Sequence, residues 1–129
     1  MKKHIPISKP YFNKQEEKVI SDVIRSGWVM QGPRVSEFEE EFAKYVGSKY
    51  AVAVSSGTAA LHLSLLAIGV KAGDEVIIPS FSFIATANSV VHCGASPVFI
   101  DIDQRTYNID PKRVEEYLAN AVKKNSKNR

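Results

Sequence analysis

The chain has 129 residues, of which 44% are hydrophobic and 24% are charged, as in an ordinary globular domain. Its formal net charge of +3 is too small to indicate a nucleic-acid partner, and no segment is long and apolar enough to suggest a membrane span. The start of the chain lacks the apolar stretch of a signal peptide, and a single cysteine, Cys93, excludes an intramolecular disulfide or a CxxC pair. These features predict a cytoplasmic location.

The first third of the chain predicts an extended arm followed by two helices. Prolines within residues 1–12 disfavour helix there. Asn13 and Glu16 have capping-box spacing and predict the start of a helix that ends at Gly27. A second capping box, Ser36 to Glu39, predicts the start of a helix that ends at Gly47. The two helices together occupy residues 13–47.

Residues 48–122 alternate between strand-like and helix-like patterns. Three short runs rich in Val and Ile predict buried parallel strands at residues 50–54, 75–78 and 98–102. Helices are predicted at residues 58–68 and about 83–92, and a last one begins with Asp110 as cap and Pro111 in its first turn. This alternation predicts an α/β layer with right-handed crossovers.

The turn at Ser56, Gly57 and Thr58 lies between the first predicted strand and an apolar helix. A glycine there lets the backbone approach a ligand closely, and the first helix amides are free to bind a phosphate. Thr58 could add a hydroxyl donor. On spacing alone, the same residues are equally typical of an ordinary helix N-cap.

Five segments, in order and at the right spacing, resemble the DegT/DnrJ/EryC1/StrS family of aminotransferases. These segments are SGWVMQGP at 26–33, FEEEFA at 38–43, SGTAAL at 56–61, GDEVIIPSFSFIATAN at 73–88 and PVFIDID at 97–103. Members of the family are pyridoxal-phosphate enzymes that mostly aminate keto-sugars attached to nucleotides. The resemblance implies that residues 1–129 are an amino-terminal fragment of a three-layer α/β/α large domain, in the fold-type I (aspartate aminotransferase-like) class.

The resemblance also assigns the cofactor site. It implies that pyridoxal phosphate is bound through its phosphate by Ser56, Gly57 and Thr58, and that Phe83 stacks on the pyridine ring. Phe81 is predicted to pack in the core. Trp28 lies in an arm that approaches the substrate pocket near the dimer interface in the family, although a Trp beside a Gly is just as often a turn anchor.

Two groups that the family's chemistry requires have no match here. The family's Schiff-base lysine and the aspartate that holds the pyridine nitrogen protonated lie beyond the segment that this chain resembles. Its own lysines at 44, 49 and 71 are predicted to lie at the surface, and Asp101 and Asp103 to serve local loop geometry. We therefore predict no catalytic residue and no metal ligand in this chain, and no activity for it alone.

The resemblance also bears on strand pairing. In the family fold, later strands separate the first strand from the second, so residues 50–54 are not expected to pair with residues 75–78.

The leading functional prediction is the phosphate-binding part of an enzyme that transfers an amino group, usually from glutamate, to a nucleotide-linked keto-sugar. By the resemblance, the intact enzyme would be a homodimer. Alternatives are a fragment of a related sugar dehydratase, or a non-catalytic remnant that only associates with a homologue. A generic nucleotide-binding domain is disfavoured because the sequence contains neither GxGxxG nor a Walker loop.

Overall fold

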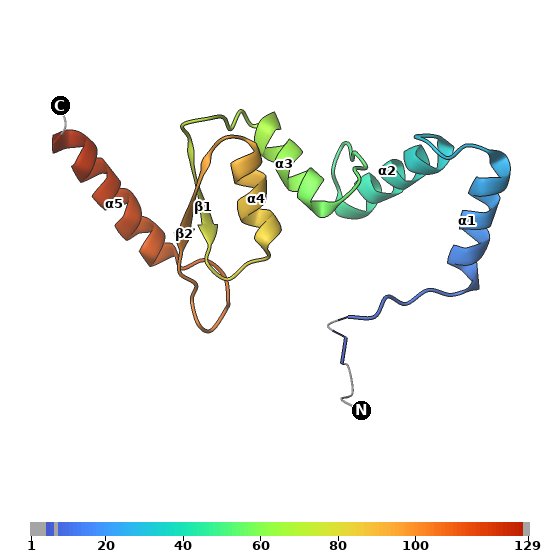
Figure 1. Cartoon of the computed structure of the whole chain (residues 1–129), viewed down its shortest axis with the longest axis horizontal. Helices are drawn as coiled ribbons and strands as arrows, with labels where there is room; N and C mark the ends of the chain where they lie inside the picture. The colour runs from blue at the N-terminus through green and yellow to red at the C-terminus, as the bar shows by residue number, and fades with distance from the viewer. Residues whose placement is uncertain (1–4, 7, 128–129) are drawn as a thin grey trace. The chain divides into compact units, whose positions relative to one another are not determined.

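The computed structural model describes residues 5–6 and 8–127, with side chains described as far as residue 121. The chain divides into two compact units, Met1–Ala53 and Val54–Arg129, whose elements are labelled in Figure 1. No helix in the described part of the chain is both long and apolar enough to cross a membrane.

The first unit contains α1 (Lys14–Ser26) and α2 (Pro33–Val46). The predicted capping box begins α1: the backbone N–H of Asn13 donates to the Glu16 carboxylate at 2.7 Å. The predicted capping box at Ser36 does not begin α2, because the N-cap is Gly32, four residues earlier, and Pro33 is the first helical residue. Proline is pre-organised for that position, so it takes precedence over the Ser36 box. Both helices end, as predicted, at glycines in the left-handed conformation.

Trp28 anchors the corner between α1 and α2. Its indole Nε1–H donates a hydrogen bond to the Gln31 carbonyl oxygen at 2.9 Å. The ring lies so close to Gly32 that a Cβ atom at that position would overlap it. The corner therefore depends on a glycine at its end, and within the first unit Trp28 acts as a turn anchor.

Residues 50–54 do not form the predicted strand. No ladder partner for them exists within the described residues, and the backbone N–H of Ala53 instead donates to the Glu39 carboxylate at 2.7 Å. An apolar run becomes a strand only where a neighbouring strand satisfies its backbone groups.

The second unit is a strand–helix–strand arrangement preceded and followed by a helix. Its elements in chain order are α3 (Gly57–Ala67), β1 (Glu75–Pro79), α4 (Ile84–His92), β2 (Ser96–Ile100) and α5 (Pro111–Lys127). β1 and β2 pair in parallel, with Ile77 opposite Val98, and α4 is the crossover between them (Figure 1). Asp110 caps α5 as predicted, since its carboxylate accepts from the backbone N–H of Lys112 at 2.9 Å.

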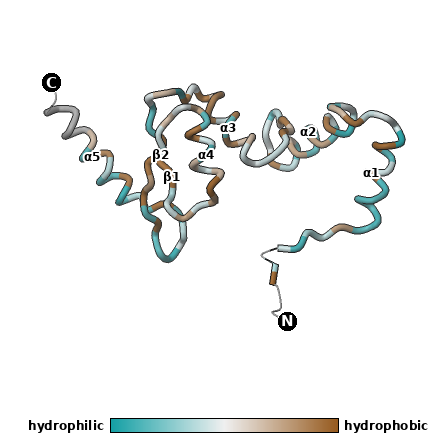
Figure 2. The backbone as a smooth tube through the Cα atoms, viewed as in Figure 1, coloured by the Kyte–Doolittle hydropathy of each residue, from teal (hydrophilic) through white to brown (hydrophobic). Residues whose placement is uncertain are grey.

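The core of the second unit is small and lies between α4 and the strands. The buried cluster consists of Ile78, Ala87, Val90 and Ala95, and half-buried apolar residues pack around it. Apolar residues also recur along α3 and the strands in Figure 2, and many of their large side chains are exposed. The described residues thus bury only part of their apolar surface.

We expect Gly32→Ala to release the Trp28 indole, because the added methyl group would overlap the ring. Loss of the hydrogen bond to Gln31 would destabilise the corner by about 0.5–1.5 kcal/mol. The chain contains one tryptophan, so its indole N–H is a single NMR resonance, and its exchange with solvent should become faster. Gly57→Ala is the control, because a Cβ atom there meets no atom within 4 Å. An unchanged exchange rate in Gly32→Ala would contradict the packing described.

We also expect the isolated chain to self-associate and to bind dyes that report exposed apolar surface. Large side chains such as Ile68 and Phe99 are 77% and 58% exposed, and contiguous apolar surface drives association. Sedimentation velocity over a concentration series and dye fluorescence would test this. A monomer with a sharp, cooperative melting transition and little dye binding would show the expectation to be wrong.

Candidate functional site

α4 begins at the edge of the sheet where β1 and β2 end, and the first turn of α3 packs against the middle of α4. β1 leads directly into α4, so α4 begins at the carboxyl ends of the parallel strands. α3 runs beside α4 in the same direction: Ser89 Oγ lies 3.4 Å from the Thr58 carbonyl, and four residues further along both helices Cys93 Sγ lies 4.0 Å from the His62 carbonyl. Ligands of open α/β sheets bind outside the carboxyl ends of the strands, which is where α4 begins.

The start of α3 combines a side-chain cap with free backbone amides. Ser56 is extended (φ −164°, ψ 163°), and its Oγ accepts from the Ala59 N–H at 3.2 Å. The first backbone bond of the helix runs from the Ala60 N–H to the Ser56 carbonyl at 3.0 Å. The amides of Gly57 and Thr58 precede it, so they have no acceptor within the helix. Ser56 is therefore an N-cap, and two amides remain for a ligand.

The space in front of these amides is open. Ser56 and Gly57 are exposed, and a Cβ atom built on Gly57 meets no atom within 4 Å. The amides point along the positive end of the helix dipole, which favours an anion. The arrangement has the geometry and polarity of a phosphate site.

Ser89 is a site residue that the sequence reasoning missed. Its side chain is 1% exposed, and its hydroxyl donates to the Ala85 carbonyl at 2.7 Å while lying near the carbonyl of Thr58. This contact joins α4 to the first turn of α3. The signal available in the sequence was a lone serine, four residues after Ala85, in a helix of small apolar residues.

The structure leaves both phenylalanines exposed, whereas Phe81 was predicted to pack in the core. Phe83 occupies the N-cap position of α4 and is 79% exposed, so its ring is open to a ligand at the carboxyl end of β1. Phe81 is not a core residue: it is 68% exposed and packs against Tyr107, with ring centroids 6.0 Å apart. Both belong to the segment between β1 and α4, which lies outside the core between helix and sheet.

The aspartates after β2 organise their own loop, as predicted. Asp103 accepts from the backbone N–H groups of Arg105 and Thr106 at 2.7 and 3.3 Å, and Asp101 accepts from the Ser80 hydroxyl at 3.0 Å. The bond from the Arg105 backbone is the main cause that holds the pKa of Asp103 below its ordinary value. Both carboxylates therefore accept hydrogen bonds from their own loop or from the neighbouring Ser80. The described residues contain no group of three or more His, Cys, Asp or Glu side chains suited to a metal ion.

The three lysines named above lie at the surface, as predicted. Lys44 forms an exposed ion pair with Glu41 at 2.8 Å, and this partner raises the pKa of the ammonium group. Lys49 Nζ lies 5.1 Å from the centre of the Tyr50 ring, and Lys71 is exposed.

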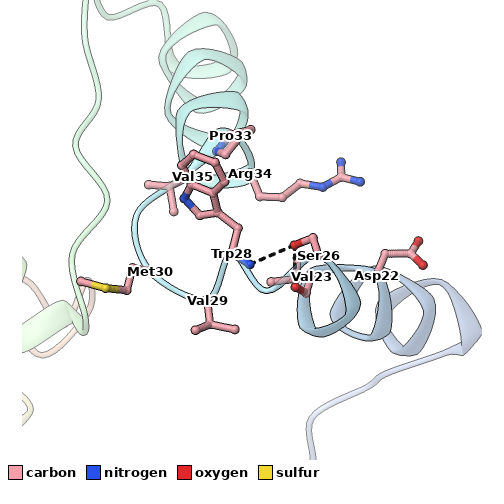
Figure 3. Close-up of a pocket in the computed structure, with 10 residues that line it drawn as sticks. Asp22, Val23, Ser26, Trp28, Val29, Met30, Pro33, Arg34 and Val35 are labelled. Atoms are coloured by element: carbon pink, nitrogen blue, oxygen red, sulfur yellow. Dashed lines mark hydrogen bonds between the residues drawn. The ribbon is translucent and has the colours of Figure 1, made fainter.

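A cavity of about 430 Å³ lies within the first unit. Figure 3 shows the Trp28 side chain beside Pro33 and Val35, while its backbone N–H donates to Ser26 Oγ at 3.1 Å. Asp22 and Arg34 add opposite charges to the lining. The cavity thus lies at the corner that Trp28 anchors.

Known proteins resemble this chain closely over most of its length. Spore coat polysaccharide biosynthesis protein SpsC of Bacillus subtilis is 50% identical over 111 residues, which are 86% of this chain and 28% of SpsC. The PLP form of Spr1654 from Streptococcus pneumoniae, a protein named as a sugar aminotransferase, superimposes with a TM-score of 0.82 at 37% identity, over 87% of this chain and 29% of that one. An aminotransferase from Psychrobacter cryohalolentis gives 0.79 at 42% identity, over 86% of this chain and 29% of that one.

The chain thus spans less than a third of the length of these relatives, 28% of SpsC and 29% of each solved structure. The parallel strands and their helices are a part of the fold-type I α/β architecture of such enzymes. The family model of the DegT/DnrJ/EryC1/StrS aminotransferases matches residues 10–126. On this match and these likenesses, the chain belongs to the DegT/DnrJ/EryC1/StrS aminotransferase family.

Proposed function

We propose that residues 1–129 are the part of a sugar aminotransferase's large domain that binds the phosphate of pyridoxal phosphate, the cofactor of this family. The observation that carries the proposal is the pair of amides at Gly57 and Thr58, which begin α3 and have no acceptor within the helix. When bound, pyridoxal phosphate supplies an electron sink for proton removal next to the amino-bearing carbon.

The candidate residues fit such a group. The Gly57 and Thr58 amides would donate to phosphate oxygens, and the Thr58 hydroxyl would add a third donor. The Ser56 hydroxyl accepts from Ala59 and retains its own proton to donate. Phe83 offers an exposed aromatic face for a flat heteroaromatic ring. Ser89 would act indirectly, because its contact fixes the start of α3 against α4.

The remaining parts of the proposal concern the whole enzyme. We propose a nucleotide-linked keto-sugar as substrate, glutamate as amino donor, a homodimeric assembly and a cytoplasmic location. The names of the relatives, a spore coat polysaccharide biosynthesis protein and a sugar aminotransferase, support a sugar substrate. No lysine of this chain matches the family's lysine motif, so the chain alone would be inactive.

The phosphate site is tested in a chimaera in which this chain replaces the matching 111 residues of SpsC. Gly57→Val should weaken pyridoxal phosphate binding by more than about 100-fold, since the side chain would keep phosphate away from both amides. Thr58→Ala removes one hydrogen bond to a charged group, about 1.5–3 kcal/mol, and keeps the amide. Phe83→Ala should cost about 0.5–1.5 kcal/mol of stacking.

The measurement is the Kd of pyridoxal phosphate for each variant, with circular dichroism to confirm folding. Phe81→Ala is the matched aromatic control and should leave the Kd unchanged, because Phe81 packs on Tyr107. If folded Gly57→Val binds as tightly as the parent, the phosphate is held elsewhere and residues 56–58 are an ordinary helix cap.

The isolated chain, supplied with pyridoxal phosphate and glutamate, should release no 2-oxoglutarate above background, because none of its lysines matches the family's Schiff-base lysine motif. The SpsC chimaera with a keto-sugar nucleotide is the positive control. Multiple turnovers by the 129-residue chain itself would disprove this expectation.

A further inference from the structure

His62 of α3 and His92 of α4 are far apart in the sequence, but the fold brings their rings into contact. The ring centroids are 5.5 Å apart, and the ring planes are perpendicular. No short sequence spacing of the kind found in metal-binding motifs joins the two residues, and the sequence accordingly predicts no metal ligand. The juxtaposition is a product of the packing of α3 on α4.

Two contacts between the helices set the positions of these histidines. Ser89 Oγ lies 3.4 Å from the carbonyl of Thr58, and Cys93 Sγ lies 4.0 Å from the carbonyl of His62 itself. Thr58 and His62 are about one helical turn apart, as are Ser89 and Cys93, so the two helices run in register here. The backbone that carries each imidazole is therefore held by contacts that involve neither ring.

The surroundings of the pair are accessible and favour a cation. His92 is exposed and His62 is half-buried, so a solute can reach the rings from solvent. Apart from the histidines, neither helix carries a basic or acidic side chain. His92 is the last residue of α4, where the partial negative charge of a helix end attracts a positive ligand.

The spacing of the rings fits two imidazoles bound to one metal ion. With Zn–N bonds of about 2.0–2.1 Å and a tetrahedral angle, the two ring centres would lie roughly 5 Å apart, close to the 5.5 Å observed. Rotation of either ring about its Cβ–Cγ bond redirects the nitrogens and moves the ring centre little. Neutral imidazole is the commonest protein ligand for such ions and suits zinc, copper, nickel and iron.

We propose that His62 and His92 form a two-histidine binding site for a divalent transition-metal ion of the zinc class, with water completing the coordination. The described residues contain no cluster of three metal-ligating side chains, so the bound ion is exchangeable. It links α3 to α4 at the carboxyl end of α4, about 12 Å along the helix from Ile84. The site is therefore separate from Phe83 and from the proposed phosphate site.

The test is titration of the untagged 129-residue chain with Zn²⁺ by isothermal titration calorimetry, without cofactor. The third histidine, His4, is replaced by alanine in every sample, so that only the pair remains. One ion should bind per chain. His62→Ala and His92→Ala should each raise the Kd for zinc by at least about tenfold. The double variant should bind no more than about twofold more weakly than either, because a single imidazole cannot chelate.

A second substitution separates metal binding from packing. His62→Phe keeps an aromatic ring against His92 but has no ligating nitrogen, so it should lose as much zinc affinity as His62→Ala while its circular dichroism spectrum is unchanged. Cys93→Ser is the control for the neighbouring thiol and should bind within about twofold of the parent. Acidification from about pH 7.5 to about pH 5 should weaken binding at least tenfold, since a protonated imidazole has no lone pair for the metal.

Equal zinc affinity in the parent and in folded His62→Phe would overturn the proposal and leave the pair as an ordinary aromatic contact. Sedimentation velocity with and without zinc supplies a further check. Zinc-dependent dimers that hold one ion between two chains would also overturn it, because the ligands would then come from different copies. A loss of about tenfold in Cys93→Ser would contradict a site made of two imidazoles.

Discussion

The close packing of α4 on the strands is the contact on which the rest of the second unit depends. Val90 and Ser89 are the most deeply buried side chains of the second unit, and each contacts a different neighbour. Val90 packs in the core with Ile78, whereas Ser89 reaches the first turn of α3 with its hydroxyl. Ala85 and Ala87 have small side chains and are buried, so the backbone of α4 can lie close to the elements that it packs against. One short helix thereby holds both the sheet and the start of α3.

This packing also supports the start of α3, although Ser56, Gly57 and Phe83 are exposed. The amides of Gly57 and Thr58 are fixed by the helix that they begin, and that helix is fixed by α4. Phe83 precedes the same α4, so the aromatic ring and the amides share one support. The cap and phosphate interpretations of Ser56 are also compatible, because the cap uses the amide of Ala59 and leaves the two earlier amides free.

Local signals in the sequence predicted the helices well and the tertiary features less well. The capping residues Asn13 and Asp110 act within a few residues of themselves, so their patterns were sufficient. The start of α2 failed because two local signals competed and Gly32-Pro33 prevailed over Ser36. Residues 50–54 failed because strand formation requires a neighbour, which no local pattern can supply. Ser89 was missed because burial depends on which face of α4 packs against its neighbours, and Phe81 was misjudged because it lies in the connection between β1 and α4, outside the core.

The sequential order of β1, α4 and β2 also has a kinetic consequence. Residues 75–100 are contiguous, so the parallel pair forms through a short crossover, and the entropy lost on closing such a loop is small. We therefore expect the helix–sheet core of β1, α4 and β2 to form early in folding, before the helices on either side of it pack.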